Sequence, residues 1–338
     1  MRIIVDAFGG DNAPLAVIKG VVAAKKEYKE DIVLVGSEEK IKACALENGI
    51  DISGIEIVNA DEVIEMCDDP TDVLKKKAGS SMSVGLRMLS EGNGDAFVSA
   101  GSTAALVVGA TLIVKRLKGV KRPALATVLP GDNKNTMIMD IGANAVCRAS
   151  MLLQFAAMGS VYMKKIYGVE NPSVGLVNIG AEETKGTPLQ LEAYKLLSES
   201  GLNFRGNVEP RDIPSTFCDV VVADGFTGNV ILKLTEGVAK MFSGRIKAVF
   251  KKNIFSGLAY LLVKGGIADF KKKMDYSEHG GAPLLGVQKP VIKAHGSSDE
   301  RAFKNAVRQA IGCVKSDMIG KIKEEVASLS HLTEGKEE

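Results

Sequence analysis

The residues of this chain that can do chemistry are concentrated in short polar loops, and the most distinctive loop runs from Asp224 to Asn229. It reads Asp-Gly-Phe-Thr-Gly-Asn and directly follows the β-branched run at 220–222, which predicts a buried strand. A helical pattern resumes near Asn229, so free backbone N–H groups at a helix N-terminus would lie beside polar side chains, an arrangement that binds anions. The same residues fit a tight turn in which Thr227 or Asn229 caps the helix.

Other loops of small polar residues follow predicted strands at 9–12, 101–103, 142–144, 178–187, 281–283 and 295–298. In an open α/β sheet the carboxyl ends of the strands converge on one crevice, which is where ligands bind. The loops offer Asn, Thr and Ser side chains and backbone N–H groups, together with one lysine, Lys185, and one histidine, His295. This set suits the positioning of an anion against an electrophile better than metal hydrolysis or a strong enzyme nucleophile.

Two of these loops resemble nucleotide-binding motifs without matching them. Gly9-Gly10 lacks the G-x-G-x-x-G spacing of a dinucleotide site, and the loop at 180–188 resembles a Walker A loop with its lysine and glycine transposed at Lys185-Gly186. Lys185 therefore offers a cation beside N–H donors, and an ordinary salt bridge fits its local sequence as well. The sequence predicts no cofactor and no metal.

Composition excludes several classes of protein. The 338 residues are 46% hydrophobic and 25% charged, with a net charge of +2, no Trp and 5% aromatic residues, which disfavours disorder and nucleic-acid binding. The five cysteines are scattered and have no nearby histidine, so we expect a reducing cytoplasm, no disulfide framework and no structural zinc. We expect neither a signal peptide nor a membrane span.

Strand and helix patterns alternate along the chain and predict a doubly wound, three-layer α/β sandwich. Predicted strands lie at 3–5, 32–35, 55–58, 96–99, 124–128, 136–139, 173–179, 220–222 and 291–294. Predicted helices begin at Leu15, after Ser80-Ser81 and at Pro188, or span 37–48, 104–114, 149–167, 229–252 and 300–329. We expect residues 1–330 to form one catalytic unit with a helical excursion at about 238–278, and residues 331–338 to be a charged tail.

The excursion contains an apolar segment at 254–263, bracketed by Lys251, Lys252 and Lys264. Ten residues cannot span a bilayer, but an apolar patch ringed by lysines suits peripheral contact with anionic lipid. The candidate contact residues are Phe255, Leu258, Leu261 and Leu262. Core packing or a dimer contact explains the same pattern.

Basic residues gather at 75–77, at Arg87 and at 115–122. Such clusters can attract phosphate or an acidic partner, although a lysine run is more often a solvated surface.

Taken together, the loops resemble one protein family in a single order along nearly the whole chain. The matching segments are 6–14, 99–103, 140–144, 175–180 with Lys185-Gly186, 224–229, 280–286 and 295–298, and they resemble the bacterial phosphate acyltransferases. The resemblance implies transfer of a fatty acyl group from acyl carrier protein to inorganic phosphate, ahead of glycerol-3-phosphate acylation by a membrane acyltransferase. It also implies a homodimer with a fold similar to the phosphotransacetylases and the isocitrate/isopropylmalate dehydrogenases.

Site residues follow from the same resemblance. Lys185, Asn144, Asn178 and His295 are expected to be catalytic, and the expected phosphate- and substrate-binding residues are Asp11, Asn12, Ser102, Thr103, Asp224, Thr227, Asn229 and Ser297. The chain departs from the family pattern at Ser102 and Ala104, where Asn and Gly are usual, and at Lys75 and Gly79, where Arg and Asp are commoner. Phosphate is itself a nucleophile, so we expect direct attack on the thioester with no acyl-enzyme.

Two functions of other classes are compatible with parts of the sequence. A nicotinamide-dependent dehydrogenase of similar fold would need a dinucleotide site, which the loop spacing does not provide. A non-catalytic scaffold at a lipid surface would explain the apolar segment but not the polar loops.

Overall fold

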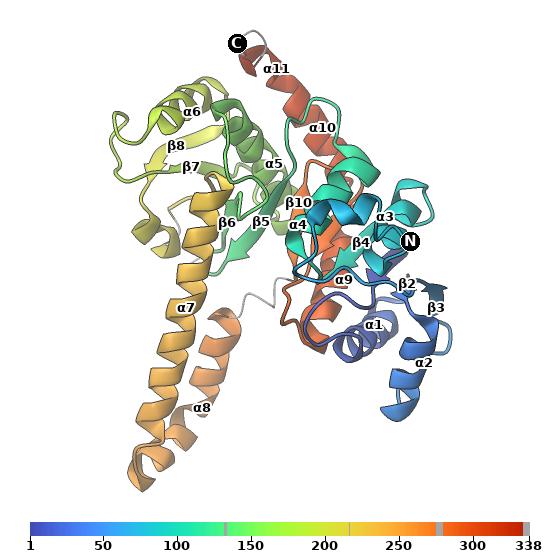
Figure 1. Ribbon diagram of the computed structural model, residues 1–338. Coiled ribbons are helices and arrows are strands. Elements are labelled where there is room, and N and C mark those ends of the chain that lie inside the picture. Colours follow the sequence, from blue (N-terminus) through green and yellow to red (C-terminus); the bar gives the residue numbers. More distant parts are fainter. Residues whose placement is uncertain (132–133, 216, 275–279, 334–338) are drawn as a thin grey trace.

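One mixed β-sheet organises the chain, and helices cover both of its faces (Figure 1). The computed structural model describes residues 1–131, 134–215, 217–274 and 280–333. The strands are β1 (Arg2–Asp6), β2 (Asp31–Gly36), β3 (Glu56–Asn59), β4 (Ala96–Ser99), β5 (Ala124–Leu129), β6 (Thr136–Met139), β7 (Ser173–Val177), β8 (Asn203–Val208), β9 (Val220–Val222), β10 (Ala282–Leu285) and β11 (Val291–Lys293).

Helices precede or follow most of the strands. They are α1 (Leu15–Tyr28), α2 (Glu38–Glu47), α3 (Ser81–Ser90), α4 (Thr103–Gly109), α5 (Ala149–Tyr167), α6 (Pro188–Glu199), α7 (Gly225–Phe250), α8 (Ile254–Met274), α9 (Glu300–Lys315), α10 (Met318–Ser328) and α11 (Ser330–Thr333). Short 3-10 helices lie at η1 (Pro70–Leu74) and η3 (Pro210–Ser215), and a π-helical segment lies at η2 (Ala110–Lys115).

The direction of the strands changes at the centre of the sheet, whose order is β3-β2-β1-β4-β11-β10-β5-β6-β9-β7-β8. Three successive pairings, β11 with β10, β10 with β5 and β5 with β6, are antiparallel, and the other pairings described are parallel. Because three reversals are an odd number, β6, β9, β7 and β8 run opposite to β1 to β4. The carboxyl ends of the two halves therefore lie at opposite edges, so a crevice shared by their loops must be reached from both edges.

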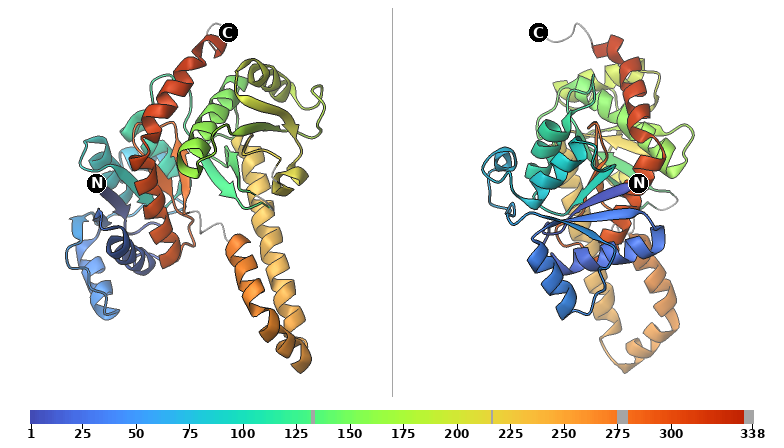
Figure 2. Two further views of the ribbon diagram at one scale, coloured as in Figure 1. Left: turned by 180° about the vertical axis from the view of Figure 1, so that it is seen from behind. Right: turned by 90° about the vertical axis from the view of Figure 1, so that its right-hand side faces the viewer.

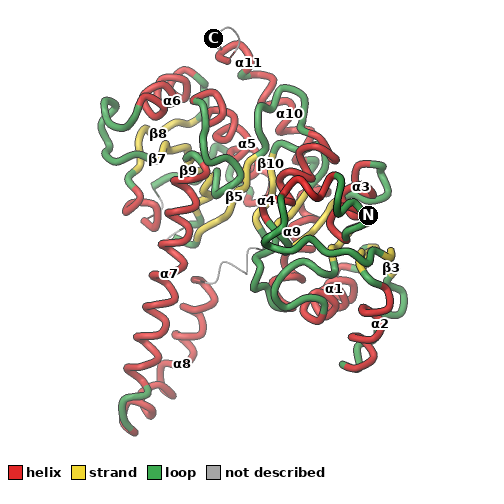
Figure 3. The backbone as a smooth tube through the Cα atoms, in the orientation of Figure 1, coloured by secondary structure: helices red, strands yellow, loops and turns green. Residues whose placement is uncertain are grey.

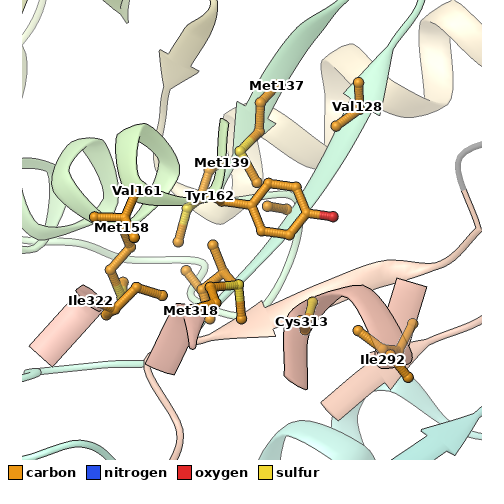
Figure 4. Packing of buried hydrophobic residues seen from close by; sticks show 14 of the residues in the cluster. Val128, Met137, Met139, Met158, Val161, Tyr162, Ile292, Cys313, Met318 and Ile322 are labelled. Carbon is orange, nitrogen blue, oxygen red and sulfur yellow. The ribbon is translucent and has the colours of Figure 1, made fainter. Parts of the chain in front are cut away.

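Helices lie on both sides of the sheet, which confirms the predicted layered α/β arrangement (Figures 2 and 3). Buried apolar side chains pack between these helices and the sheet in two main clusters. The larger cluster includes residues of α1, α5, α9 and α10, and a second cluster includes residues of α3, α4 and η2. In Figure 4, Met137 and Met139 of β6 lie close to Tyr162 of α5 and Met318 of α10. The buried Tyr162 hydroxyl accepts a hydrogen bond from Gln309 Nε2 at 2.7 Å, so this polar atom is not left without a partner.

Three parts of the sequence prediction need correction. The predicted helix at 300–329 is two helices, since Asp317 adopts a left-handed conformation with φ of 50° between α9 and α10. β8 was missed because its sequence is polar and contains Gly206, which has a φ of 94°. β10 was missed because Pro283 disfavours a central strand, and the expected loop at 281–283 enters this strand instead. Part of the expected tail, residues 334–338, and residues 275–279 of the excursion lie outside the described residues.

The helices α7 and α8 form a hairpin that extends away from the sheet (Figures 1 and 2). The rings of Phe250 and Tyr260 join the two helices, with their centroids 5.5 Å apart. Of the residues of α7, only Gly225 and Gly228 are buried. None of the helices described is long and apolar enough to cross a membrane.

The buried glycines hold the start of α7 against the loop that follows β6. The Gly225 N–H donates to the Asn144 carbonyl oxygen at 2.7 Å, and a Cβ atom at Gly228 would lie only 1.8 Å from the Asp140 carbonyl oxygen. The backbones can approach this closely only because neither glycine carries a side chain.

We predict that Gly228→Ala lowers the thermal unfolding temperature, with a loss of about 2 kcal/mol or more, because the methyl group forces α7 away from the Asp140 carbonyl. Gly237→Ala is the matched control: a Cβ atom there meets nothing within 4 Å, so the better helix propensity of alanine should leave stability unchanged or raise it by up to about 1 kcal/mol. Equal unfolding temperatures for the two variants would contradict this role of Gly228.

Candidate active site

The loops after β1 and β11 are joined by hydrogen bonds at one edge of the sheet. The Asp11 N–H donates to the Gly296 carbonyl oxygen at 2.8 Å, and Asn12 Nδ2 donates to the Ser297 and Ser298 carbonyl oxygens, each at 3.2 Å. Three of the residues expected from the sequence, Asp11, Asn12 and Ser297, therefore lie together, and they support the loop that carries His295.

The imidazole of His295 has a defined hydrogen-bonding state at Nδ1. This atom accepts from the Ser297 N–H at 3.2 Å and lies 2.9 Å from the Ser297 hydroxyl oxygen. Partial burial lowers the pKa of His295 below its ordinary value, because desolvation disfavours the charged ring. The neutral imidazole therefore carries its proton on Nε2, from which it can donate.

Asp140 organises the loop after β6 at the other edge. Its buried carboxylate accepts from the N–H groups of Leu125, Gly142, Ala143 and Asn144 at 2.7–3.2 Å. Burial raises the pKa of Asp140, although these hydrogen bonds oppose the shift. The Asn144 side chain donates to the same carboxylate at 2.9 Å and to the Pro123 carbonyl oxygen at 2.8 Å, so its amide group holds the loop in place.

The cap of α7 is Asp224 rather than the alternatives Thr227 and Asn229. The Asp224 carboxylate accepts from the Thr227 N–H at 2.8 Å and from the Thr227 hydroxyl at 2.8 Å. One of the N–H groups that was expected to bind an anion is therefore already bound to a carboxylate.

Asn178 closes the loop after β7. Its buried side chain donates to the Lys185 carbonyl oxygen at 3.0 Å and accepts from the Ile179 N–H at 2.8 Å. Gly186 has a φ of 99°, and a Cβ atom there would come within 2.7 Å of Asn178, so glycine is required at this turn. The Lys185 side chain itself is exposed.

A cavity of about 370 Å³ lies over the central strands, between α4 and α7. Loops from both edges of the sheet can reach this cavity because the central strands are short: β10 has four residues and β11 has three. Its lining residues are Thr103, Ala104, Leu125, Thr127, Ile141, Gly142, Asn229, Leu232, Lys233, Glu236, Gly280, Gly281, Ala282, Lys293, Ala294 and His295. The volume suits a small-molecule site.

The cavity receives some of the expected site residues and not others. Thr103, Asn229 and His295 line it directly. Ser102 lies one residue before this wall and caps α4 by accepting from the Ala105 N–H at 3.5 Å. Those outside the lining are Asp11, Asn12, Asn144, Asn178, Lys185, Asp224, Thr227 and Ser297.

Three charged residues of the cavity lining, Lys233, Glu236 and Lys293, are not among those expected from the sequence. Lys293 is only 8% exposed, and Lys233 forms an ion pair with Glu236 at 2.9 Å. The signal for Lys293 is present in the sequence, because a lysine ends the apolar strand Val291–Lys293 two residues after Val291 and therefore on the same face of the sheet.

No activated thiol or metal cluster supports other chemistry in the part of the chain that the structure describes. No group of three or more His, Cys, Asp or Glu side chains is placed to hold a metal ion there. Cys147, the cysteine near this loop, has its pKa raised to about 12 by burial, so it remains a thiol rather than a nucleophilic thiolate.

Comparison with known sequences identifies one family. The family model described as "Fatty acid synthesis protein" matches residues 1–321. The chain is 48% identical over 330 residues to a phosphate acyltransferase of Thermoanaerobacter pseudethanolicus, covering 97% of this chain and 98% of that protein. It is 47% identical over 333 residues to a phosphate acyltransferase of Clostridium tetani, covering 98% and 100%.

Solved structures share the fold at low sequence identity. A phosphotransacetylase from Streptococcus pyogenes is 18% identical with a TM-score of 0.63, covering 93% of this chain and 94% of that one. A 4-hydroxythreonine-4-phosphate dehydrogenase from Klebsiella pneumoniae is 12% identical with a TM-score of 0.52, covering 93% and 98%. These likenesses confirm the predicted fold class.

Proposed function

The chain belongs to the fatty acid synthesis protein family of phosphate acyltransferases, and on this premise we propose that it transfers a fatty acyl group from acyl carrier protein to inorganic phosphate. The observation that supports this reaction most directly is the central cavity, which combines polar donors with an apolar wall. Thr103, Asn229 and His295 supply the donors, while Leu125 and Ile141 supply part of the wall. A phosphate ion and the carbonyl end of a thioester require these two surroundings side by side.

In the proposed reaction, a phosphate oxygen attacks the thioester carbonyl carbon and the carbon–sulfur bond breaks. The proton of monohydrogen phosphate passes to the departing thiolate, so the products are an acyl phosphate and a free thiol. We assign stabilisation of the developing negative charge to Nε2 of His295 on the cavity wall, because Nδ1 accepts from the Ser297 N–H. The buried, protonated thiol of Cys147 gives no support to an acyl-enzyme.

The remaining expected residues take supporting roles in this proposal. Asn144 and Asn178 position the loops that contain them, and Asp224 with Thr227 fixes the start of α7. Lys185 lies after β7, at the same edge of the sheet as Gly142, and we assign its exposed ammonium group to attraction of the anionic substrates rather than to the cavity itself.

We predict phosphate-dependent release of free thiol from acyl-acyl carrier protein by the purified full-length chain. No thiol should appear without phosphate, added NAD should change nothing, and mass spectrometry should find no acylated protein. Thiol release without phosphate, or reduction of NAD, would reject the proposed reaction, and an acylated protein would reject direct attack by phosphate.

Exposed cations near the end of η2 are the proposed docking surface for acyl carrier protein, which is acidic. Lys115, Lys118 and Arg122 are exposed and make no ion pair with the described part of the chain. The cluster at 75–77 with Arg87 is less available for docking. Lys76 and Lys77 form ion pairs with Asp72 and Asp68, respectively. Arg87 donates to the Ala78 carbonyl oxygen, so Lys75 is the cation of this cluster to which we assign no such contact.

Reversal of two charges, Lys118→Glu with Arg122→Glu, should weaken carrier-protein binding several-fold at low salt and much less at high salt. The control is Lys26→Glu with Lys40→Glu, which changes the net charge equally on exposed residues of α1 and α2. The measurement is KM for acyl-acyl carrier protein at two salt concentrations. Equal effects of the two pairs of substitutions on this KM would reject the proposed docking surface.

The hairpin presents two separate apolar surfaces. Phe226, Val230, Leu234, Val238 and Phe242 are 40–68% exposed and recur every fourth residue, so neighbours in this series are adjacent and form a stripe that winds gradually around α7. A continuous exposed stripe of this kind is typical of an interface, and we propose that it contacts the same helix region of a second copy in a homodimer.

The second apolar surface lies on α8. Phe255, Leu258, Leu261 and Leu262 are 55–89% exposed, and Lys251, Lys252 and Lys264 are exposed around them. We propose that this surface contacts anionic lipid peripherally from the cytoplasm, where a membrane glycerol-3-phosphate acyltransferase can receive the acyl phosphate.

Two double variants should separate these surfaces. Leu234→Glu with Phe242→Glu should convert the dimer to a monomer in light scattering, because two charges would be buried in the contact. Leu258→Glu with Leu261→Glu should abolish flotation with anionic liposomes and leave the oligomeric state unchanged. Each variant controls for the other, and flotation that survives in the second would refute the lipid contact.

A further inference from the structure

Lys293 is the charged side chain that the central cavity encloses most completely. It ends β11, opposite Ser99 of β4 and Ala282 of β10 in the sheet register. Val291 packs in the cluster beneath α3 and α4, and alternation along the strand places Lys293 on that same face, where the cavity lies.

The hydrogen bonds of Lys293 leave one donor unused. Its ammonium group donates to the Ala294 carbonyl oxygen at 2.5 Å and to the Ala100 carbonyl oxygen at 3.2 Å. A lysine has three N–H donors, so one remains for the cavity. No carboxylate of the described residues lies within ion-pair distance of it.

A buried charge without a counter-charge is unfavourable in the ligand-free protein. Burial lowers the pKa of Lys293 to about 8, against the attraction of Asp6 and Asp11, while Lys233 adds to the lowering. Glu236, bound to Lys233, and the imidazole of His295 complete the titratable groups around the cavity. A dianion bound in the cavity would supply the missing counter-charge.

We propose that Lys293 is the inner ligand of inorganic phosphate in the acyl transfer. This inference rests on the proposed function and locates its phosphate in the central cavity, with Thr103 and Asn229 on the wall and Lys185 outside. The ammonium group of Lys293 offsets one of the two negative charges of monohydrogen phosphate, while a phosphate oxygen forms the bond to the thioester carbon and the carbon–sulfur bond breaks. The proton of phosphate leaves with the thiol, so Lys293 keeps its own protons.

The test compares Lys293→Met with Lys185→Ala in the full-length protein. Loss of a charge-assisted hydrogen bond in the cavity should raise KM for phosphate by about tenfold or more, with a much smaller change in KM for acyl-acyl carrier protein. Loss of the exposed Lys185 should raise KM for phosphate by less than about fivefold. A change of less than twofold in Lys293→Met, or the reverse order of the two variants, would overturn the inference.

Direct binding separates this inference from the proposed reaction. Inorganic phosphate alone should raise the thermal unfolding temperature of the wild-type protein and not that of Lys293→Met. Without phosphate, Lys293→Met should be at least as stable as the wild type, since an unpaired buried charge is removed. Phosphate binding that depends on Lys293 without thiol release would reject the acyl transfer but not the role of Lys293 in binding. Thiol release by the wild type with unchanged phosphate binding in Lys293→Met would reject the role of Lys293 but not the acyl transfer.

Lys293→Arg provides a test that does not depend on removing the charge. In the wild type, KM for phosphate should rise as pH increases above about 8, because Lys293 loses its proton there. Arginine stays protonated throughout this range, so Lys293→Arg should lack that rise. The same alkaline rise in both proteins would contradict the assignment.

Discussion

The contact between the Asp140 loop and the first turn of α7 determines the geometry of much of the molecule. The Asp140 carboxylate collects the N–H groups of its own loop and of Leu125, and so it fixes the junction of β5 and β6. Gly228 then packs against the Asp140 carbonyl oxygen at a distance that no larger residue allows. This contact sets where Asn229, Lys233 and Glu236 enter the cavity and where the hairpin leaves the body.

The reversal of strand direction at the centre of the sheet explains the form of the site. In a fully parallel sheet the polar loops would share one edge, but three antiparallel pairings place them at two. The central strands are short enough that a cavity on their face receives residues from both edges, with Thr103 and His295 from one and Gly142 and Asn229 from the other. Lys185 and Asn178 follow β7, farther from this centre, and remain outside the lining.

The hydrogen bonds also divide the polar residues into those that build the site and those that face a substrate. In the sequence alone, Asn144 and Asn178 resemble substrate ligands. In the structure, their side-chain amides donate hydrogen bonds to backbone or carboxylate oxygens of the protein itself. Lys293 shows the opposite case: it resembles the end of an ordinary strand, but its neighbours satisfy only part of its donors and enclose it in the cavity.

The sequence by itself determined the family, the α/β fold class, most strands and helices, and the loops that carry polar residues, because apolar periodicity and glycine positions are local signals. It could not reveal β10, because Pro283 disfavours a strand. The segment forms a strand through its pairing with β5 and β11, which lie on either side of it. It also could not decide which loops meet at the cavity, because that depends on strand direction and hence on long-range pairing. Only the tertiary structure shows Lys293 buried beside Ala100 and Ala294, since burial of a charge is a property of the neighbours that surround it and not of the residue.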